Sequence, residues 1–468
     1  MRLVTGIILS IITLAIQAQQ SLPLFQISDM QYQGAFRLPA ADYGNSDLNY
    51  SEGPIEYNPK NHSLFIVGHD HQQSIAEFSI PALVTGTLEQ LNMGTNLQPF
   101  TSHLSAVACG NTQNINQIAG LKLIGGQLWV NAYEYYDADG NVTNTTLVID
   151  NPAALGTSDV LGYFNYEGGA GHTAGWITEV PPVWQTLLGG SHLTGMSSGI
   201  PIISRCSVGP SAFSFNPGQM PLDCSSPQIP TTQLLDFSLA NPLHDDLDNS
   251  SGQNDIWTHL SRATYGLIVP GTRTYLTVGY SGGHLSGVCY KCTQSDDNLC
   301  GGYCAPQADD YEQYYWLWDL NDLLAVKNGQ KQAHEVTPYD YGALNTPIGS
   351  PAKEIGGGAF DPSSGMLYLT LQRADTAQGT YANPPVVIAY QISSPICQSC
   401  CVNQVFLSTS DVFSGMRVYS QDYLQSNAVI DALTNLQWKF SEYVEMIHPF
   451  EINLGSDLTI EMEECSVQ

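Results

Sequence analysis

The sequence predicts an all-β fold: a β-propeller of six or seven blades, followed by a small β-rich module. Residues 55–81 and 358–392 both contain an aromatic residue, an Asx-Pro pair, a polar turn, an apolar strand, a loop and a second strand. One strand-turn-strand unit at both ends of a chain is typical of a ring of repeats that closes on itself. The low charged fraction of 12%, with 43 Gly and 26 Pro, suits many short strands joined by turns.

The elements between the two end units are also mostly strands. Residues 119–148 contain hairpin turns at Gly125-Gly126 and Asp139-Gly140, and residues 265–280 contain a turn at Pro270-Gly271. Further strands are predicted within 200–215 and 311–320, and short helices at 183–188 and 319–327, the second with Asn321 as its N-cap. Over roughly 370 residues, this density suits six or seven blades of four strands, with a two-sheet sandwich as the alternative.

The two ends of the chain have a different character from the middle. Residues 1–18 read as a secretory signal peptide with cleavage after Ala18, because a basic start precedes a short apolar run. No later segment reaches the roughly 20 apolar residues of a membrane-spanning helix. We therefore expect a secreted or cell-surface bacterial protein with a propeller at 19–395 and a β-rich module at 396–468.

The charge balance bears on the class of ligand. Fourteen basic against 43 acidic residues give a formal net charge of -29, which repels nucleic acid and polyanionic glycans. An acidic surface that keeps a secreted protein soluble is the simplest reading, and divalent cations at acidic loops are the alternative. We expect an extracellular glycan or small-molecule ligand, and no nucleic acid.

The 11 cysteines suggest disulfides in an oxidising compartment. Cys289, Cys292, Cys300 and Cys304 stand in one loop, which two bridges would staple, with a zinc site as the alternative. Cys206 and Cys224 flank a Pro-rich loop and could pair with each other.

Four residues are candidates for catalysis. His172 and His284 stand in glycine-flanked loops, where the backbone can approach a ligand closely. A lyase would need a neutral base and a proton donor, which a histidine and Tyr280 supply. Arg205 could clamp a carboxylate or phosphate from within a central channel, with an ordinary ion pair as the alternative. A glycoside hydrolase is the other enzyme class considered, although its carboxylate pair cannot be selected from so many acids.

Four residues are candidates for ligand binding. His69 and His71 would share one face if the preceding strand continued through them. They could start a zinc site, with His172, His284 or Asp245 as third ligand, or an acid-base site, and capping of a loop at the strand end is the alternative. Arg262 follows a polar segment that could line the same mouth. Trp316 belongs to an aromatic run that either stacks on sugar or packs in the core.

Calcium is the first metal considered. Asp137, Asp139 and Asn141 resemble the start of an oxygen-ligand loop, but the distal Glu of an EF-hand is missing, and an Asp-Gly hairpin turn explains the pattern equally.

The tail resembles the small stacked-β modules at the C-termini of secreted Bacteroidetes proteins. The resemblance covers about 50 residues and lies in Asn427, Ile430, Phe450, Ile452, Gly455, Leu458, Thr459, Ile460 and Cys465. It implies contact with a secretion or cell-surface attachment machinery.

The larger part resembles a family of secreted bacterial β-propeller-like proteins with no established activity. The resemblance lies in residues 34–39, 64–69, 179–184, 203–205, 209–213 and 318–324. It implies secretion and a shared fold, and transfers no catalytic residue. The predicted function is a secreted propeller that binds, and potentially processes, a ligand such as a carbohydrate at the mouth of its channel. A non-catalytic interaction scaffold is the alternative.

Overall fold

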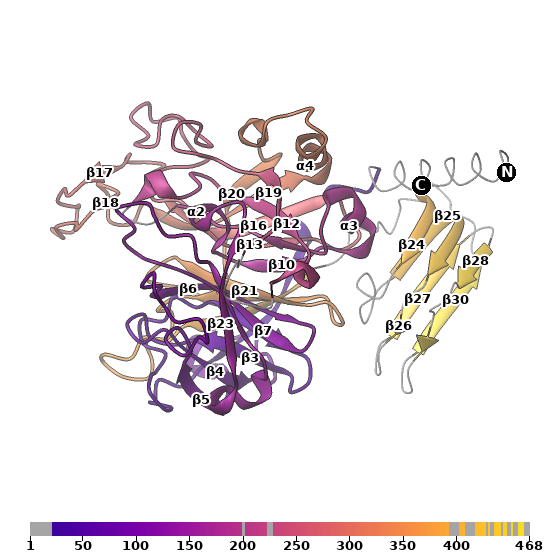
Figure 1. The fold of residues 1–468 in the computed structure, drawn as a ribbon, viewed down its shortest axis with the longest axis horizontal. Helices are drawn as coiled ribbons and strands as arrows, with labels where there is room; N and C mark the ends of the chain where they lie inside the picture. The colour runs from indigo at the N-terminus through magenta and orange to yellow at the C-terminus, as the bar shows by residue number, and fades with distance from the viewer. Residues whose placement is uncertain are drawn as a thin grey trace.

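The computed structural model describes residues 21–198, 202–221 and 228–392, and seven strands between residues 402 and 462. The signal peptide predicted at residues 1–18 lies outside the described residues. Five sheets of four or five strands form the body of the molecule (Figure 1). We call these sheets blades 1 to 5 in the order of their innermost strands.

Within each blade the strands are antiparallel neighbours, except that β13 joins blade 2 in parallel to β9. Blade 1 contains β2 (Ile55–Asn58), β3 (Ser63–Val67), β4 (Ser74–Ser79) and β5 (Asn96–Ser102). Blade 2 contains β6 (Gln117–Ile124), β7 (Gln127–Tyr133), β8 (Thr146–Ile149), β9 (Val160–Tyr166) and β13 (Gln228–Ile229). Blade 3 contains β10 (Ile177–Glu179), β11 (His192–Thr194), β12 (Ala212–Phe215) and β14 (Thr232–Leu235).

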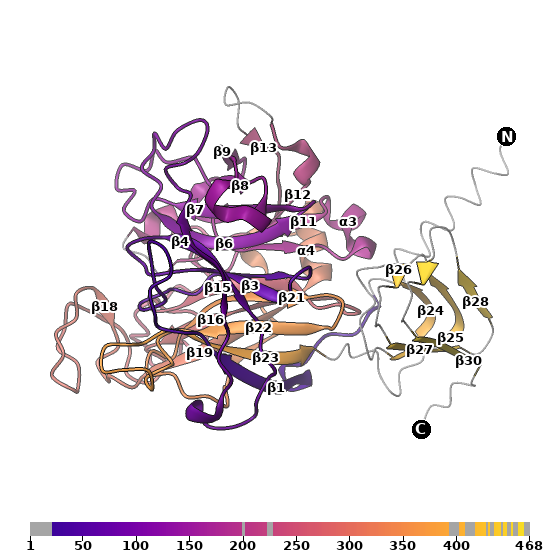
Figure 2. The ribbon, with the colours of Figure 1, turned by 90° about the horizontal axis from the view of Figure 1, so that it is seen from below.

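The last two blades follow the same plan. Blade 4 contains β15 (Arg262–Ile268), β16 (Thr274–Gly282), β19 (Tyr311–Asp319) and β20 (Asp340–Ala343). Blade 5 contains β21 (Ile355–Asp361), β22 (Met366–Leu371), β23 (Val386–Ile392) and the N-terminal strand β1 (Met30–Arg37). Figure 2 shows β1, in indigo, beside β23, in orange.

The five blades close into a ring. The innermost strands β2, β6, β10, β15 and β21 each contact the next one, and β21 contacts β2. The N-terminal strand β1 pairs with β23 from Met30↔Ile392 to Arg37↔Val386. Both ends of the propeller therefore belong to one blade, and the hydrogen bonds between them hold the ring closed. The fold is therefore a β-propeller, and the predicted sandwich alternative is wrong.

The predicted number of six or seven blades is also wrong. The described chain has five, because long connections occupy length that we had assigned to strands. Residues 236–261 contain no strand, and residues 283–310 contain only the short hairpin of β17 (Cys289–Tyr290) and β18 (Tyr303–Cys304).

The repeated end units are confirmed as neighbouring blades. They form β2 to β4 of blade 1 and β21 to β23 of blade 5. Their Asx-Pro pairs make equivalent first turns, since the Asn58 side chain accepts a hydrogen bond from the Lys60 amide (3.2 Å) and Asp361 accepts one from the Ser363 amide (3.0 Å). The turns at Gly125-Gly126 and Pro270-Gly271 are confirmed as well, with left-handed φ at all three glycines.

Glycines let the inner strands approach one another closely. A Cβ atom on Gly356 would lie 2.0 Å from the Glu52 carbonyl oxygen, and one on Gly120 would lie 2.2 Å from the Gly175 carbonyl oxygen. Any side chain at these positions would push neighbouring blades apart. The axis of the propeller is therefore narrow.

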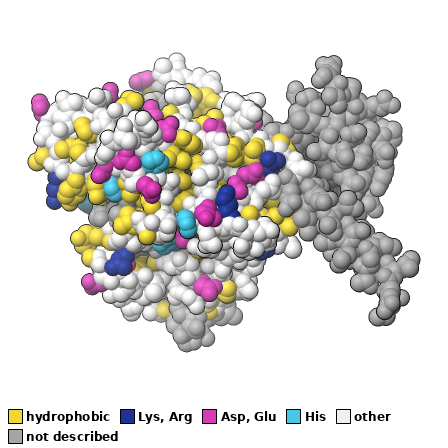
Figure 3. All heavy atoms as spheres, turned by 90° about the horizontal axis from the view of Figure 1, so that it is seen from above, with side chains coloured by type: hydrophobic (Ala, Val, Ile, Leu, Met, Phe, Trp, Pro, Cys, Tyr) yellow, Lys and Arg dark blue, Asp and Glu magenta, His cyan; other side chains and the backbone are white. Residues whose placement is uncertain are grey.

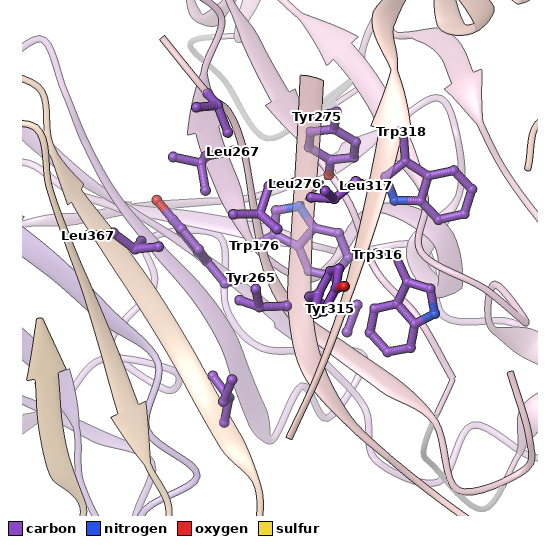
Figure 4. Close-up of a cluster of buried hydrophobic side chains, with 14 of the residues drawn as sticks. Trp176, Tyr265, Leu267, Tyr275, Leu276, Tyr315, Trp316, Leu317, Trp318 and Leu367 are labelled. Carbon is purple, nitrogen blue, oxygen red and sulfur yellow. Dashed lines mark hydrogen bonds between the residues drawn. The ribbon is translucent and has the colours of Figure 1, made fainter. Parts of the chain in front are cut away.

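The core between blades 3, 4 and 5 is rich in aromatic side chains (Figure 4). The Trp176 indole donates to the Tyr275 hydroxyl at 2.8 Å, and the Trp316 indole donates to the Ile256 carbonyl at 2.9 Å. Trp316 and Trp318, two residues apart on β19, are both fully buried. The expectation that Trp316 contacts a ligand is therefore corrected: the core alternative holds.

The two predicted helices form as α3 (Pro182–Leu188) and α4 (Leu320–Lys327), and a further turn forms α2 (Ala170–Thr173). The N-cap of α4 is Asp319, whose carboxylate accepts from the Asn321 amide at 2.9 Å; our assignment of Asn321 as the cap was two residues late. None of the helices in the described part is long and apolar enough to cross a membrane.

The tail contains further strands. They are β24 (Val402–Leu407), β25 (Arg417–Ser426), β26 (Val429–Ile430), β27 (Asn435–Phe440), β28 (Tyr443–Met446), β29 (Glu451–Ile452) and β30 (Asp457–Met462). In the described part of the tail these strands pair in parallel. The predicted boundary at 395/396 stays a prediction, and Asn427, Phe450, Gly455 and Cys465 lie outside the described residues.

A buried carboxylate organises blade 1. Glu77 accepts hydrogen bonds from the side chains of Asn58 (2.7 Å), Asn61 (2.9 Å), Ser63 (2.5 Å) and Gln98 (2.6 Å). Burial alone would raise the pKa of this carboxyl, but the four donors outweigh it and the pKa is lowered. Its contribution to stability is therefore present above the pKa of the unfolded chain and is lost as pH falls through the lower folded pKa.

We expect Glu77→Leu to lower the free energy of unfolding by roughly 3 kcal/mol, because four donors lose their acceptor. Glu77→Gln should lower the free energy of unfolding by less. In this variant the free energy of unfolding should also fall less steeply as the pH is lowered. Urea denaturation at neutral pH and at a pH of about 4 measures both effects. The exposed Glu312→Gln serves as the control, and an equal loss in that variant would contradict this role of Glu77.

Candidate functional site

All five inner strands begin at the same face of the propeller, which we call the entry face. Because strands alternate in direction, the loops between the second and third strands of every blade lie at this face too: residues 68–73, 134–145, 195–198 with 202–211, 283–310 and 372–385. These loops and strand ends carry every candidate site residue except Trp316 and His172, and His172 lies in α2, in the connection that leads into the inner strand β10. Most of the predicted site residues therefore share one face of the fold, and their role there stays a prediction.

A small cavity opens where the inner strands begin. It is lined by Glu52, Pro54, Ile118, Ala119, Gly175, Trp176, Met196, Arg262, Ala263, Thr264, Gly356 and Gln372. Its volume of about 10 Å³, like that of a second cavity deeper along the axis, corresponds to about one water molecule. The axis is thus closed below a shallow mouth, and a ligand would rest on the mouth and not pass through.

Arg262, the first residue of β15, is the central cation of the mouth. Only 11% of its side chain is exposed. Its guanidinium donates to the Tyr133 hydroxyl at 3.2 Å and lies 3.5 Å from a Glu52 carboxylate oxygen, and Arg262 pairs with Tyr280 across β15 and β16. Burial acts to lower its pKa, but Tyr133, Tyr280 and Glu52 outweigh burial and hold the pKa well above its ordinary value.

The tyrosines beside Arg262 are neutral hydrogen-bonding groups. Burial raises the pKa of Tyr280 to about 12, although the Arg262 charge works in the opposite direction. Burial likewise raises the pKa of Tyr133. At neutral pH both phenols keep their protons, so Tyr280 can position or donate a proton but cannot act as a base.

A second charged pair borders the mouth on blade 5. Glu354 immediately precedes β21, and Arg373 donates to its carboxylate at 2.6 Å. Burial raises the pKa of Glu354, against the opposing effect of Arg373. Gln372, which precedes Arg373 in the sequence, is buried and lines the same cavity as Arg262.

Sequence reasoning missed Glu52, Tyr133, Glu354 and Gln372. Position relative to the strands could have identified three of the mouth residues, because Glu52, Glu354 and Arg262 each stand within three residues of the start of an inner strand. Recognising it required the identity of the inner strands, which the local pattern of alternation does not provide.

The two candidate histidines lie apart from the mouth cavity. His172 pairs with Asp236, with 2.5 Å between Nδ1 and the carboxylate oxygen. In His284 both ring nitrogens have protein partners, the Ser281 hydroxyl at 2.7 Å and the Asn254 carbonyl at 2.9 Å. His284 thus ties a loop together, which is a structural role.

Arg205 connects two loops of the entry face. It lies in a short 3₁₀ helix (Ile203–Arg205), its side chain is exposed, and it donates to the Ala138 carbonyl at 3.3 Å. The expectation that it points into the central channel is therefore corrected: Arg262 holds that position. Part of the expected strand before Arg205, residues 199–201, lies outside the described residues.

His69 and His71 lie in the turn after β3, since that strand ends at Val67. The expectation that the strand continues through them is wrong. Their ring centroids are nevertheless 5.1 Å apart, and His69 Nδ1 accepts from the His71 amide at 3.1 Å. The two histidines belong to the loop of residues 68–73 on the entry face.

The predicted calcium loop forms a hydrogen-bonded turn, in which Asp137 accepts from the Asn141 amide at 3.2 Å. Calcium at Asp137, Asp139 and Asn141 stays a prediction. Among the described residues, the only three His, Cys, Asp or Glu side chains that are grouped closely enough to share an ion are Cys289, Cys292 and Cys304.

The cysteines form disulfides as predicted in the loop, as Cys289–Cys292 and Cys300–Cys304. Cys109 is also disulfide-bonded. Cys206 is a free, buried thiol, so its predicted pairing with Cys224 is wrong. Burial raises the pKa of this thiol to about 12, which leaves it protonated and unreactive at neutral pH.

The surface shows no basic patch that would suit nucleic acid on the side seen in Figure 3. Acidic side chains are scattered across this face, with histidines and a few basic residues among them. This distribution agrees with the net charge of -29.

No protein-family model and no curated protein sequence matches the chain. Among solved structures, the chain is similar to the catalytic domain of a GH62 alpha-L-arabinofuranosidase from Coprinopsis cinerea (TM-score 0.32, 10% identity, 77% of this chain and 98% of that chain covered). It is also similar to a putative oxidoreductase (glucose dehydrogenase) from Thermus thermophilus (TM-score 0.28, 11% identity, 74% and 98% covered).

A third similar structure is PorZ, a surface component of the type-IX secretion system of Porphyromonas gingivalis (TM-score 0.27, 12% identity). The match covers 77% of this chain and 41% of PorZ. Because these scores and identities are low, we base the functional conclusion on the residues of this chain alone.

Proposed function

We propose that this protein is a secreted propeller that binds a neutral carbohydrate at the mouth on its entry face. Arg262, Glu52, Tyr280 and Gln372 supply the hydrogen bonds. The observation that carries the proposal is the position of Arg262, buried at the mouth and held by two tyrosines and a carboxylate.

The charges at the mouth favour a neutral ligand. Arg262 has Glu52 as its counter-ion, and Arg373 has Glu354, so each positive charge is compensated within the protein. A polyanion would meet these carboxylates and a strongly acidic surface. Sugar hydroxyls both donate and accept, which matches guanidinium, carboxylate, amide and phenol groups arranged over the apolar floor of Trp176 and Met196.

For turnover of such a ligand we assign the two carboxyl groups at the mouth. Glycoside hydrolysis uses one carboxylic acid as proton donor and a second carboxylate as base or nucleophile. Burial raises the pKa of Glu354, so its protonated form, which no longer compensates the charge of Arg373, has the chemistry of the donor, and Glu52 has that of the second group. Of the residues first considered for catalysis, Tyr280 alone keeps a role, as a neutral hydrogen-bond donor.

Gln372→Leu tests the binding proposal with little change in volume. We expect its affinity for neutral oligosaccharides, measured by isothermal titration calorimetry, to fall roughly 10- to 100-fold, because one or two hydrogen bonds are lost in a desolvated site. The matched control is Gln307→Leu, an exposed glutamine on the entry face. Wild-type protein that binds uronic acid polymers and no neutral sugar would contradict the proposal.

An interaction scaffold is the second candidate function, and the loop between β16 and β19 favours it. This loop exposes large apolar side chains, including Leu285 (83% exposed) and Leu299 (71% exposed). Exposed apolar residues gathered on one projecting segment are typical of protein contacts. A Leu285→Ser, Leu299→Ser variant that loses cell-surface retention but keeps sugar binding would support this second function.

A further inference from the structure

The loop of residues 283–310, which we call the cysteine loop, projects from blade 4 at the entry face. Figures 1 and 2 show its hairpin, β17 and β18, at the outer edge of the molecule. The loop is anchored at its base, where Asp310 accepts from the Leu285 and Ser286 amides and Tyr303 stacks on His259 with ring centroids 4.1 Å apart. The cysteine side chains thus occupy a defined position.

The sulfur atoms of the two disulfides lie against one another. Cys304 Sγ lies 3.9 Å from Cys289 Sγ and 3.4 Å from Cys292 Sγ, and Cys300 is bonded to Cys304. Four thiolates around one zinc ion, each at about 2.3 Å, are separated from each other by about 3.8 Å. The spacing between the two disulfides is therefore close to the edge of such a tetrahedron.

The backbone of the hairpin already brings both ends of the loop to this place. Cys289 pairs with Cys304 across β17 and β18, and the Cys300 amide donates to the Cys292 carbonyl at 3.0 Å. The sequence places two residues between Cys289 and Cys292 and three between Cys300 and Cys304, so each pair spans a single turn. Two such turns facing each other are the usual frame of a four-cysteine zinc site.

We propose that the cysteine loop binds one Zn²⁺ through Cys289, Cys292, Cys300 and Cys304 when its two disulfides are reduced. An external thiol or phosphine supplies the electrons: two disulfides accept four electrons and four protons to give four thiols, while the reductant is oxidised. Zinc then displaces the four thiol protons as it binds. The oxidised loop has no free thiolate and binds no metal, so the site is controlled by redox state.

This site is separate from the mouth and does not depend on the proposed carbohydrate function. Its ligands belong to the projecting loop, whereas the mouth is lined by inner strands. The same loop carries exposed apolar residues, Tyr290 and Leu299 among them. Either the disulfides or the bound metal must hold these residues in place.

Titration of the intact protein with Co²⁺ and then Zn²⁺ tests the proposal. After anaerobic reduction and removal of the reductant, we expect one Co²⁺ per chain with the absorption spectrum of tetrahedral thiolate ligation, displaced by one Zn²⁺. Protein that was not reduced should bind none at this site. Circular dichroism before and after reduction establishes that the propeller stays folded.

Two sets of variants identify the ligands. Cys292→Ser and Cys300→Ser should each abolish the tetrathiolate spectrum. Cys206→Ser, at the buried free thiol, and the combined replacement of Cys397, Cys400 and Cys401 by serine should leave it unchanged. Reduced, folded protein that binds no Co²⁺, or a thiolate spectrum that survives Cys292→Ser, would overturn the proposal.

Discussion

Replacing Arg262 with methionine is expected to lower the affinity for a neutral oligosaccharide by at least about a hundredfold. Methionine fills a similar volume but removes every donor of the guanidinium. It also leaves Glu52 without its counter-ion and Tyr133 without its hydrogen-bond partner. Loss of one member of such a buried network affects both the ligand and the groups that orient it.

The matched control is Arg205→Met, which removes an exposed arginine from the same face. We expect its affinity to stay within about twofold of the wild type, because surface substitutions rarely change energies by more than about 0.5 kcal/mol. Arg262→Lys keeps the positive charge but loses the forked set of guanidinium donors. Its affinity should lie between those of Arg262→Met and Arg205→Met. Equal losses in Arg262→Met and Arg205→Met would mean that the mouth is not the site.

Glu56→Leu is expected to reduce the free energy of unfolding by about 3–5 kcal/mol, the range found when a buried ion pair loses one partner. Glu56 on β2 lies 2.8 Å from the ammonium group of Lys122 on β6 and also accepts from the Leu123 amide at 3.1 Å. Burial alone would lower the pKa of Lys122, but Glu56 outweighs burial and raises it. Removing Glu56 therefore leaves a buried cation between blades 1 and 2.

The double variant Glu56→Leu, Lys122→Met distinguishes lost pairing from lost packing. We expect it to recover most of the stability, because two apolar side chains of similar volume can replace a buried ion pair at little cost. Urea denaturation of both single variants and the double variant gives the coupling energy. Additive losses would contradict a direct interaction between these two residues.

The fold could be predicted where one local pattern repeats. The Asx-Pro turn units at residues 55–81 and 358–392 revealed a ring, and the structure places them in neighbouring blades joined by β1. The blade count could not be predicted in the same way, because local alternation does not separate blade strands from connections. Residues 236–261 and the cysteine loop together occupy the length of a further blade without forming one.

The candidate site could be predicted only in part, for a related reason. Arg262 was selected because basic residues are scarce and because it follows a polar segment, and Tyr280 because a lyase needs a proton donor; the structure pairs the two residues across β15 and β16. His172, His284 and Arg205 also reach the entry face, but each is engaged by a local partner there. Arg262 lines the cavity between the inner strands, whereas His172, His284 and Arg205 do not, and closure of the ring, which no short segment encodes, decides which residues meet there.

The central claim is that ligand rests on the mouth, and a crystal structure of the protein soaked with the oligosaccharide that binds best tests it most directly. We predict density for sugar at the start of the inner strands, with hydroxyl groups within hydrogen-bond distance of Arg262 and Gln372. Sugar bound only at the cysteine loop, or at the face where β23 ends, with the mouth empty, would contradict the account.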